Sequence, residues 1–452
     1  MSILNQNYPD KYQDKAILLL LLCLAAIWNI PNTIATRYIC ESLLVILLLT
    51  SKINWIDALK KLKILFIFVI YLLIQLLFFS TDFSAALKNF KSEWMHFLIF
   101  SIIGIGSGIV LSKYKNTNLL LILGVAFAIP LFIHISLVLF KGLEMNQIPW
   151  GYWGISKIHG DLAYASLQSA ILLMTYLLCQ KNTLTGKLIS IPTLVVCITS
   201  PLVAQSRGGL IFTLIVIFTS IILFILSSKD FRRKKLNLFL MLFISLLFGA
   251  IVIKVSMQYD SVRWSNLSQK IKIGFSGDPN LVFCNGIGSL ERDILKKRGS
   301  ISSEEHKALS TILDGDGARV MAARSGVELI PQNFMGINGS KNAYQIAISS
   351  YCQGAPKIFI SHTHNAWVDT SLAIGVIGAL MLIVYYITLA ALGLRYFIYD
   401  NRINPFSFAL FISAFIWFLR GLLDSTLRDQ MLEIQAFILP FLFILSYKFM
   451  RK

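Results

Sequence analysis

Residues 118–140 read NLLLILGVAFAIPLFIHISLVLF, a run without a single Asp, Glu, Lys or Arg. A helix of about 20 predominantly apolar residues crosses a bilayer, so this stretch is long enough to span a membrane. Runs of similar length and composition recur from one end of the chain to the other. Because hydrocarbon offers no partner for backbone polar groups, such uniformly apolar runs predict helices rather than the strands of a membrane barrel.

The composition of the whole chain agrees with a membrane helix bundle. The 452 residues are 56% hydrophobic and 14% charged, with a mean hydropathy of +0.69, whereas soluble domains carry about 25% charged residues. A formal charge of +18 would indicate nucleic-acid binding in a soluble protein. In a membrane protein, however, Lys and Arg gather in short cytoplasmic loops. We expect no cleavable signal peptide, because the first apolar stretch lacks an Ala-x-Ala exit.

The apolar runs predict an all-α fold, a polytopic membrane helix bundle of about twelve spans. The spans are predicted near residues 16–31, 37–51, 62–80, 96–112, 118–140, 161–179, 186–204, 209–227, 236–255, 365–391, 404–421 and 432–449. If the N-terminus is cytoplasmic, every second connection and the C-terminal tail should be basic. They contain Lys52, Lys60, Lys61, Lys63, Lys113, Lys115, Lys181, Lys187, Lys229, Arg232, Arg233, Lys234, Lys235, Arg395, Arg402, Lys448, Arg451 and Lys452. This alternation predicts that both termini are cytoplasmic.

The same threading places four segments on the outer side: residues 141–160, 205–208, 256–363 and 422–431. The longest of them is rich in Ser, Gly, Asn and charged residues, which indicates a partly helical cap outside the membrane. The chain is therefore predicted to hold transmembrane helices 1–9 in residues 1–255. A large periplasmic loop follows in residues 256–363, and transmembrane helices 10–12 lie in residues 364–452.

Two of the six cysteines, Cys284 and Cys352, lie in the predicted loop, whereas the other four lie in or beside predicted spans. In an oxidising periplasm the loop pair can close a disulfide. Two free thiols are equally consistent with the sequence, so both states stay open at this point.

Arg207 lies in the short outer segment Gln-Ser-Arg-Gly-Gly, residues 205–209. A positive charge on the outer side runs against the topological bias of membrane proteins. Two glycines beside it let the backbone and a ligand approach closely, which favours a binding site. The alternative is an arginine that anchors a helix end by extending its charge toward the interface.

Arg319 lies inside the predicted loop and precedes an apolar-patterned stretch, residues 320–330. The pattern predicts an amphipathic helix that begins near this arginine. By itself the sequence favours an ordinary surface arginine at this position.

Residues 362–365, His-Thr-His-Asn, lie where the loop re-enters the membrane. An imidazole at the mouth of a membrane cavity can accept a proton near neutral pH, as a general base must. Histidines at i and i+2 can also begin a metal site, but no third ligand stands at a recognisable spacing, so we predict no metal. The structural alternative is that His364 caps the following helix together with Asn365.

Other charged segments carry weaker signals. Asp-Gly-Asp-Gly of residues 314–317 lacks the further oxygen ligands of a calcium loop and predicts a turn. Arg420, Asp424, Arg428 and Asp429 surround the last outer turn, and the first two are spaced to pair on one helical face. The sequence contains no Walker loop, nucleotide-binding fold or nucleophile elbow. The energy for any reaction must then come from the substrate.

The histidine segment resembles the O-antigen ligase family, the lipid A–core:surface polymer ligases. His364-Asn365, followed by Gly375 and Gly378, matches that family's His-Asn signature with its downstream glycines. The family belongs to a broader group that also holds O-antigen polymerases and protein O-oligosaccharyltransferases.

Two arginine motifs extend the resemblance. Arg207 matches the family's outer arginine in a Gln-Ser-Arg context, and Leu210 completes the Arg-x-x-Leu that follows. Arg319, with Pro331 and Gly336 behind it, resembles the second arginine, which the family carries in its large periplasmic loop. The resemblance covers the whole chain in architecture and only short segments in motif, with all three motifs in order and on one side of the membrane.

The resemblance implies a glycosyltransferase of lipopolysaccharide biosynthesis in the bacterial inner membrane, with its active site on the periplasmic face. Its partners are an undecaprenyl-diphosphate-linked O-antigen as donor and a sugar hydroxyl of lipid A–core as acceptor. Arg207 and Arg319 are assigned to the diphosphate, since planar guanidinium groups suit phosphate oxygens. His364 is assigned to proton removal from the acceptor. Single displacement inverts the anomeric configuration, and no cofactor, metal, ATP or nucleic acid is implied.

Supporting roles are expected for His362, Asn365 and Arg428. His362 precedes the signature histidine and can share or take over the role of general base.

Several other functions compete with the ligase reading. An O-antigen polymerase uses the same donor and a second lipid-linked glycan as acceptor. A protein O-oligosaccharyltransferase usually carries a longer C-terminal periplasmic portion than the few residues that follow the last predicted span here. A transporter or flippase of lipid-linked sugars should show internal repeats or paired broken helices, which are not evident. A purely structural membrane protein would leave Arg207, Arg319 and His364 unrelated.

Overall fold

The computed structural model describes residues 12–450 except 52, 54, 56–59, 115–117, 157–158, 181–182, 228–230 and 398–403. These residues form helices and connecting turns, without a strand, which confirms the all-α prediction. Some of the basic residues behind the predicted orientation lie outside the described residues: Lys52, Lys115, Lys181, Lys229, Arg402, Arg451 and Lys452.

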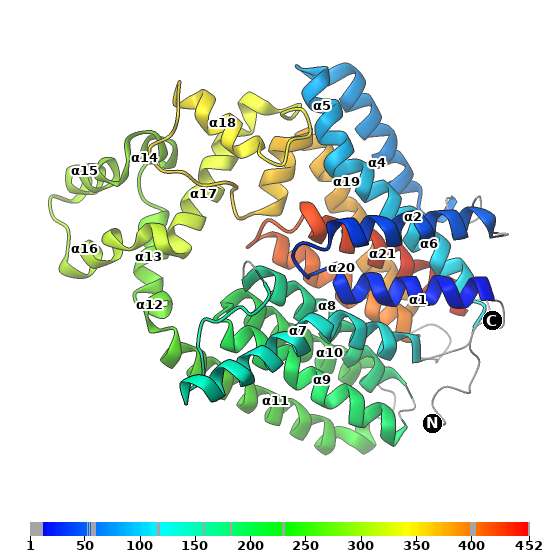
Figure 1. The fold of residues 1–452 in the computed structure, drawn as a ribbon. Coiled ribbons are helices and arrows are strands. Elements are labelled where there is room, and N and C mark those ends of the chain that lie inside the picture. Colours follow the sequence, from blue (N-terminus) through cyan, green and yellow to red (C-terminus); the bar gives the residue numbers. More distant parts are fainter. Residues whose placement is uncertain are drawn as a thin grey trace.

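Long helices come from both ends of the chain (Figure 1). The N-terminal part contains α1 (Tyr12–Ile27), α2 (Ile34–Thr50), α4 (Lys63–Ile74), η2 (Gln75–Phe79), α5 (Phe83–Asn89), η3 (Phe90–Trp94), α6 (Met95–Leu111), α7 (Asn118–Met145), α8 (His159–Cys179), α9 (Leu184–Val203), α10 (Arg207–Ser227) and α11 (Phe231–Tyr259). The C-terminal part contains α19 (Ala366–Phe397), α20 (Pro405–Gly421) and α21 (Asp429–Met450). Both η2 and η3 are π-helical.

Between these two parts lies a cap of short helices. It contains α12 (Ser261–Trp264), α13 (Leu267–Gly274), α14 (Pro279–Asn285), α15 (Ile287–Arg298), α16 (Ser303–Ser310), η4 (Ile312–Asp314), α17 (Asp316–Leu329), η5 (Pro331–Asn333) and α18 (Ala343–Tyr351). In Figure 1 the helices from α12 to α18 gather at one end of the bundle, at the left of the view. The helix predicted after Arg319 is α17, and the predicted Asp-Gly-Asp-Gly turn is the short passage from η4 into it.

The apolar helices make the chain an integral membrane protein. Among the described residues, eight helices are long and apolar enough to cross a membrane: Phe83–Leu111, Asn118–Met145, His159–Cys179, Leu184–Val203, Arg207–Ser227, Phe239–Tyr259, Ala366–Phe397 and Asp429–Met450. Lys63–Phe79 and Pro405–Gly421 are apolar but shorter. A helix overlaps each of the twelve predicted spans. The number of membrane crossings and the periplasmic location of the loop nevertheless stay predictions.

The long helices differ in how far the protein itself surrounds them. Within their most apolar windows, α21 is 89% and α8 is 83% buried, whereas α11 is only 17% buried. Helix α21 packs closely on α6, and α8 packs on α7 and α10. The apolar side chains of α21 and α8 therefore form the centre of the bundle, while α11 presents most of its apolar surface outward.

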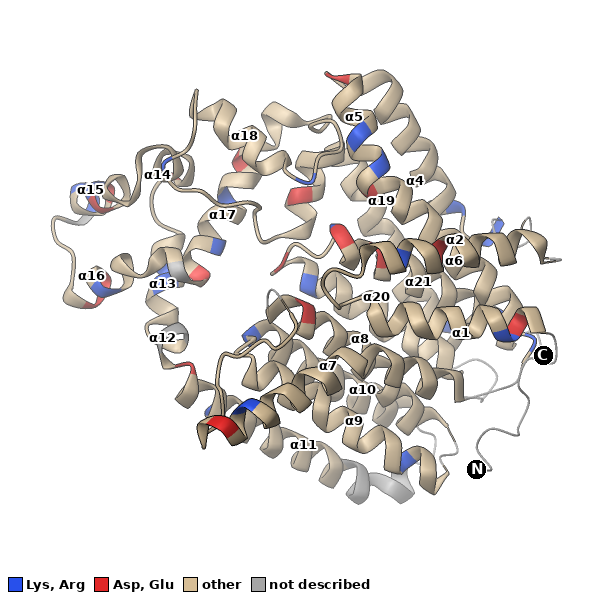
Figure 2. Ribbon diagram, viewed as in Figure 1, with Lys and Arg blue, Asp and Glu red and all other residues tan. Residues whose placement is uncertain are grey.

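Charged residues are sparse along the middle of the long helices and gather on the cap and at helix ends (Figure 2). This distribution follows from the cost of placing a charge in hydrocarbon without a partner. We therefore expect a polar site among the charged residues at the boundary between cap and bundle.

A break in α19 anchors the cap to the bundle. Gly375 has a φ of 86°, and the N–H of Val376 donates to the carbonyl of Phe334 at 3.0 Å, outside the helix. A Cβ on Gly336 would lie 2.4 Å from the backbone nitrogen of Gly375, so the two backbones touch at their glycines. The hydroxyl of Tyr71 donates to the carbonyl of Ile374 at 2.6 Å. Glycine at position 375 thus permits the backbone of α19 to pack directly against the backbone of the cap.

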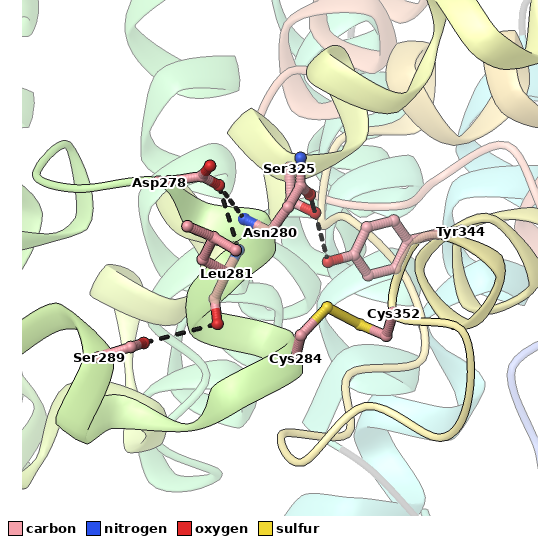
Figure 3. The surroundings of a disulfide bond; sticks show 8 residues. All are labelled: Asp278, Asn280, Leu281, Cys284, Ser289, Ser325, Tyr344 and Cys352. Atoms are coloured by element: carbon pink, nitrogen blue, oxygen red, sulfur yellow. Dashed lines mark hydrogen bonds between the residues drawn. A yellow bond between two sulfur atoms is a disulfide. The ribbon is translucent and has the colours of Figure 1, made fainter.

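Cys284 and Cys352 form a disulfide (Figure 3), which resolves the two states that the sequence left open. The bond joins the end of α14 to the residue after α18. Next to it, the hydroxyl of Tyr344 donates to Ser325 on α17 at 3.0 Å. The disulfide and this buried contact hold three cap helices together.

Candidate active site

One cavity of about 710 Å³ lies between the bundle and the cap. Its lining residues come from α8, α10, α12, α13, α17, the turn before α19, and the connection from α20 to α21. The residues singled out from the sequence that line it are Arg207, Arg319, His362, His364 and Arg428. Segments far apart in the chain therefore bring five candidate residues to one cavity.

Arg207 connects the bundle to the cap. It is the first residue of α10, and its Nη1 lies 2.9 Å from Oδ2 of Asp316, the first residue of α17. Its guanidinium also lies 5.6 Å from the ring centroid of Trp264 in α12. Gly208 lines the cavity, and a Cβ added to it would meet no atom within 4 Å, whereas a Cβ on Gly209 would press against Ala163 of α8. One glycine leaves open space and the other permits close helix packing.

Arg319 lies one turn after Asp316 on α17 and is half-buried. Among the described residues no hydrogen bond or ion pair involves its guanidinium. The helix that carries it is held firmly, because Arg324 on the same helix donates to the carbonyls of Gly274 and Gly277, both at 3.0 Å. Arg319 is thus a partly exposed cation on a fixed helix.

The histidine turn is tied to the bundle by its backbone. Thr363 is fully buried, and its N–H donates to Oδ1 of Asp369 at 2.9 Å. The other oxygen of Asp369 accepts a hydrogen bond from the hydroxyl of Ser425. His364 adopts a left-handed backbone conformation with a φ of 56°, and its ring centroid lies 4.2 Å from that of His362. The turn therefore presents two neighbouring imidazoles to the cavity.

Both imidazoles are neutral at physiological pH. Burial, followed by the repulsion that a protonated His362 and the Arg319 charge would exert, lowers the pKa of His364 to about 3. Burial also lowers the pKa of His362. Nδ1 of His364 is buried without a hydrogen-bond partner among the described residues, while Nδ1 of His362 lies 2.6 Å from the hydroxyl of Ser361. A neutral imidazole with an unused nitrogen can accept a proton.

Asn365 does not line the cavity. Its Oδ1 accepts hydrogen bonds from the N–H groups of Trp367 and Val368, both at 3.1 Å, and so caps α19. Its Nδ2 donates to the carbonyl of Leu422 at 3.1 Å. These contacts fix the turn that carries His364, as the structural alternative in the sequence anticipated for Asn365.

Arg420 and Asp424 belong to a group of side chains that the sequence predicted only as a pair. Their side chains lie 3.8 Å apart, which confirms the predicted pairing, and Arg420 is only 2% exposed. Tyr164 completes the group: its hydroxyl donates to Asp424 at 2.8 Å, and its ring lies 4.2 Å from the Arg420 guanidinium. Burial raises the pKa of Asp424, but Arg420 and Arg319 lower it further, so the carboxyl is ionised.

The sequence did not predict a role in the site for two residues, Tyr164 and Asp316. Tyr164 sits in an apolar run, where nothing marks one tyrosine as different from any other. Asp316 carried a local signal, because acidic and basic residues three apart share a helix face, which places Asp316 beside Arg319. The partner that it actually uses is Arg207, which lies far away in the chain.

Two neighbouring histidines could contribute ligands to a metal site. Among the described residues no group of three His, Cys, Asp or Glu side chains is arranged to hold a metal ion. The prediction that the site uses no metal stays a prediction.

Comparison with known proteins adds a family assignment to this geometry. The model of the O-antigen ligase family matches residues 192–383, a region that contains Arg207, Arg319 and His364. No curated protein sequence matches the chain. The match supports an O-antigen ligase or polymerase type of function. Residues 192–383 therefore belong to the O-antigen ligase family, and the resemblance drawn from the sequence motifs is confirmed.

Proposed function

We propose that this protein is an O-antigen ligase. It transfers a glycan from undecaprenyl diphosphate to a sugar hydroxyl of lipid A–core, and it crosses the bacterial inner membrane about twelve times. The observation that carries the proposal is the cavity, which combines four arginines with two neutral histidines between the membrane helices and the cap. Such a site suits a reaction in which a diphosphate leaves and a hydroxyl loses a proton.

In this proposal Arg207 and Arg319 bind the donor's diphosphate. Guanidinium groups donate paired hydrogen bonds to phosphate oxygens, and these bonds strengthen as negative charge grows on the leaving group. The acceptor oxygen attacks the anomeric carbon while the bond from that carbon to the diphosphate breaks. The diphosphate leaves with the electron pair, and the anomeric configuration inverts.

His364 takes the proton of the acceptor hydroxyl. In the free enzyme its pKa of about 3 makes it a weak base, because burial and nearby positive charge disfavour the imidazolium. A bound diphosphate adds negative charge close to the arginines and offsets that penalty. Donor binding therefore raises the basicity of His364 at the moment when the acceptor must be deprotonated, and His362 is placed to share the proton.

The cap is proposed to lie in the periplasm. The Cys284–Cys352 disulfide supports this, since such bonds persist in oxidising compartments and are rare in the cytosol. The basic residues of the predicted cytoplasmic connections support the same orientation. Both lipid-anchored substrates can then reach the cavity from the membrane.

The test is glycan transfer in a host that lacks its own ligase. Ladder-bearing lipopolysaccharide is scored on a gel for wild type and for His364→Ala, Arg207→Ala and Arg319→Ala, with membrane abundance measured in parallel. Arg292, an exposed arginine of α15 outside the cavity, provides the control variant Arg292→Ala. We expect a ladder from wild type and from the control, and its loss from the three cavity variants at normal abundance.

Other results separate the competing functions. Lengthening of lipid-linked polymer without any ladder on lipid A–core would identify a polymerase. Transfer retained by His364→Ala would exclude this residue as the general base and direct attention to His362. A ladder from all three cavity variants would overturn the assignment of the site.

A further inference from the structure

The four arginines of the cavity differ in how many of their donors the protein already uses. Arg420 is enclosed by Tyr164, Phe212 and Asp424, and its Nε is buried without a hydrogen-bond partner among the described residues. Arg207 is paired with Asp316. Arg428 uses its Nε, which donates to Oδ2 of Asp429 at 3.2 Å. Its Nη1 is buried and has no hydrogen-bond partner among the described residues, which is a costly state for a cationic donor.

Three separate chain segments hold Arg428 in place. The next residue, Asp429, has a φ of 49°, a left-handed conformation that a non-glycine residue adopts only when its surroundings enforce it. Its N–H donates to Oε2 of Glu93 at 2.9 Å, and its Oδ1 accepts from Nζ of Lys341 at 2.6 Å. Lys341 also lies 3.3 Å from Oε1 of Glu93. The cap loop, the π-helical turn η3 and the start of α21 thus meet at one ionic bridge.

The bridge satisfies its own charges. Burial lowers the pKa of Lys341, but Asp429 and Glu93 raise it by more, so the ammonium stays protonated. Lys341 shares its charge between two carboxylates, and Asp429 in turn takes only one edge of the Arg428 guanidinium. None of these contacts involves the buried Nη1 of Arg428, which has no hydrogen-bond partner among the described residues.

Arg428 shares the cavity with the histidines. It lines both the large cavity and a smaller adjoining pocket that also contains Glu93 and Lys341. Its charge, like that of Arg319, acts on both His362 and His364. Arg319 and Arg428 therefore approach the histidine pair together, one from the cap and one from the bundle.

We propose that Arg428 is a third ligand-binding arginine, which donates to the phosphate oxygens of the lipid diphosphate beside His364. The Glu93–Lys341–Asp429 bridge is the positioning unit that holds it there. This inference rests on the proposed function and adds to it an arginine that lies outside residues 192–383, the region matching the family. A guanidinium held by one edge presents its other edge as a rigid fork, the geometry that phosphate oxygens accept in pairs.

The experiment measures binding rather than turnover, so it does not depend on which acceptor the enzyme uses. The full chain is purified into lipid nanodiscs, and the dissociation constants of undecaprenyl diphosphate and undecaprenyl monophosphate are measured. The variants are Arg428→Gln, Arg428→Lys and Lys341→Met, with Arg292→Gln as the control. Thermal unfolding of each variant verifies that it is folded.

We expect Arg428→Gln to weaken diphosphate binding about tenfold or more, as the loss of a charge-assisted contact predicts. The monophosphate should lose less, so the preference for diphosphate falls. Arg428→Lys should recover part of the affinity, because it restores the charge without the fork. Lys341→Met should weaken binding less than Arg428→Gln does, and the Arg292→Gln control should bind as tightly as wild type.

Three failures are distinguishable. If wild type binds neither lipid, the proposed function itself is wrong. If wild type binds the diphosphate and a folded Arg428→Gln binds it equally well, Arg428 is a structural residue and the inference is overturned. If a folded Lys341→Met binds the diphosphate as tightly as wild type, the bridge does not position Arg428, and that part of the inference is wrong.

Discussion

The two walls of the cavity use the same residue types in opposite ways. On the bundle wall, Arg420 is 2% exposed and lies among Tyr164, Phe212 and Asp424. On the cap wall, Arg319 is half-buried and has no partner among the described residues. A buried charge is stable only when other groups compensate it, whereas a charge with unused donors is available to a ligand. The enclosed Arg420 thus stabilises the bundle wall, whereas Arg319 on the cap wall is available to a ligand.

A second contrast lies within the cap itself. Arg319 and Arg324 are on the same helix, yet Arg324 uses its donors on backbone carbonyls that join α17 to the region after α13. Both arginines are half-buried, so their hydrogen-bond partners, rather than residue type or burial, separate the structural arginine from the ligand-binding one. Substitutions on each side of this division should have opposite effects on stability and on transfer.

The largest effect is expected from Arg420→Ala on the bundle wall. Removing this buried guanidinium leaves Asp424, whose side chain is 29% exposed, without its main partner, so the free energy of unfolding should fall by up to about 3–5 kcal/mol. Thermal unfolding in nanodiscs and membrane abundance measure this loss against Arg292→Ala. Normal stability of Arg420→Ala would show that the bundle wall does not depend on this charge, and the contrast between the walls would fail.

Arg319→Ala should lower glycan transfer and leave the stability of the protein unchanged. Transfer should fall about 10²- to 10³-fold, the usual cost of removing one donor that stabilises developing charge, while thermal unfolding stays close to wild type. Arg324→Ala is its matched partner on α17: it should lower stability by about 1–3 kcal/mol, because buried carbonyls lose their donor. If Arg319→Ala unfolds as readily as Arg324→Ala, the distinction between a ligand-binding and a structural arginine on α17 is wrong.

The pH dependence of the reaction tests the charge balance on the cap wall. In the free enzyme His364 has a pKa of about 3, so it stays neutral as the pH falls through the ordinary histidine value near 6.5. The acidic limb of kcat/KM, which reports the free enzyme, should therefore lie below about pH 5. Bound diphosphate raises the pKa, so the acidic limb of kcat should lie at higher pH. Identical limbs in the two profiles would contradict this.

The smallest effect is expected from Asp316→Asn, at the contact between the walls. The Arg207–Asp316 pair is partly exposed and contributes at most about 1 kcal/mol. Without the carboxylate, Arg207 does not have to break an ion pair with Asp316 in order to bind the donor. The affinity for the donor should therefore rise by up to about fivefold. Titration with undecaprenyl diphosphate measures it. A weaker affinity would mean that Asp316 holds Arg207 in its binding position.

Much of the fold was predictable because membrane helices are determined locally. Length and apolarity decide whether a segment can cross a bilayer, and these properties can be read from residues such as 118–140 without knowledge of any neighbour. A helix overlaps each predicted span. The helix after Arg319 was also predicted correctly, because its apolar pattern lies within one segment.

The sequence also identified several site residues, but not how they combine. The order of the arginine and histidine motifs pointed to one family, and all three motif residues line one cavity. The sequence could not distinguish Arg420, which is 2% exposed, from Arg428, whose side chain is 20% exposed, since both are arginines beside the same outer turn. Only their partners, Tyr164 for the first and Asp429 for the second, make the difference.

The sequence by itself determined that the chain is an all-helical membrane protein with a polar cap and a histidine turn, because these features depend on local composition and motif. Tertiary structure alone decided that Cys284 and Cys352 are joined, that Arg207 pairs with Asp316, and that Lys341 supports the turn before α21. The physical reason is distance along the chain. Such contacts arise only when helices pack, and packing is a property of surfaces that no single segment contains.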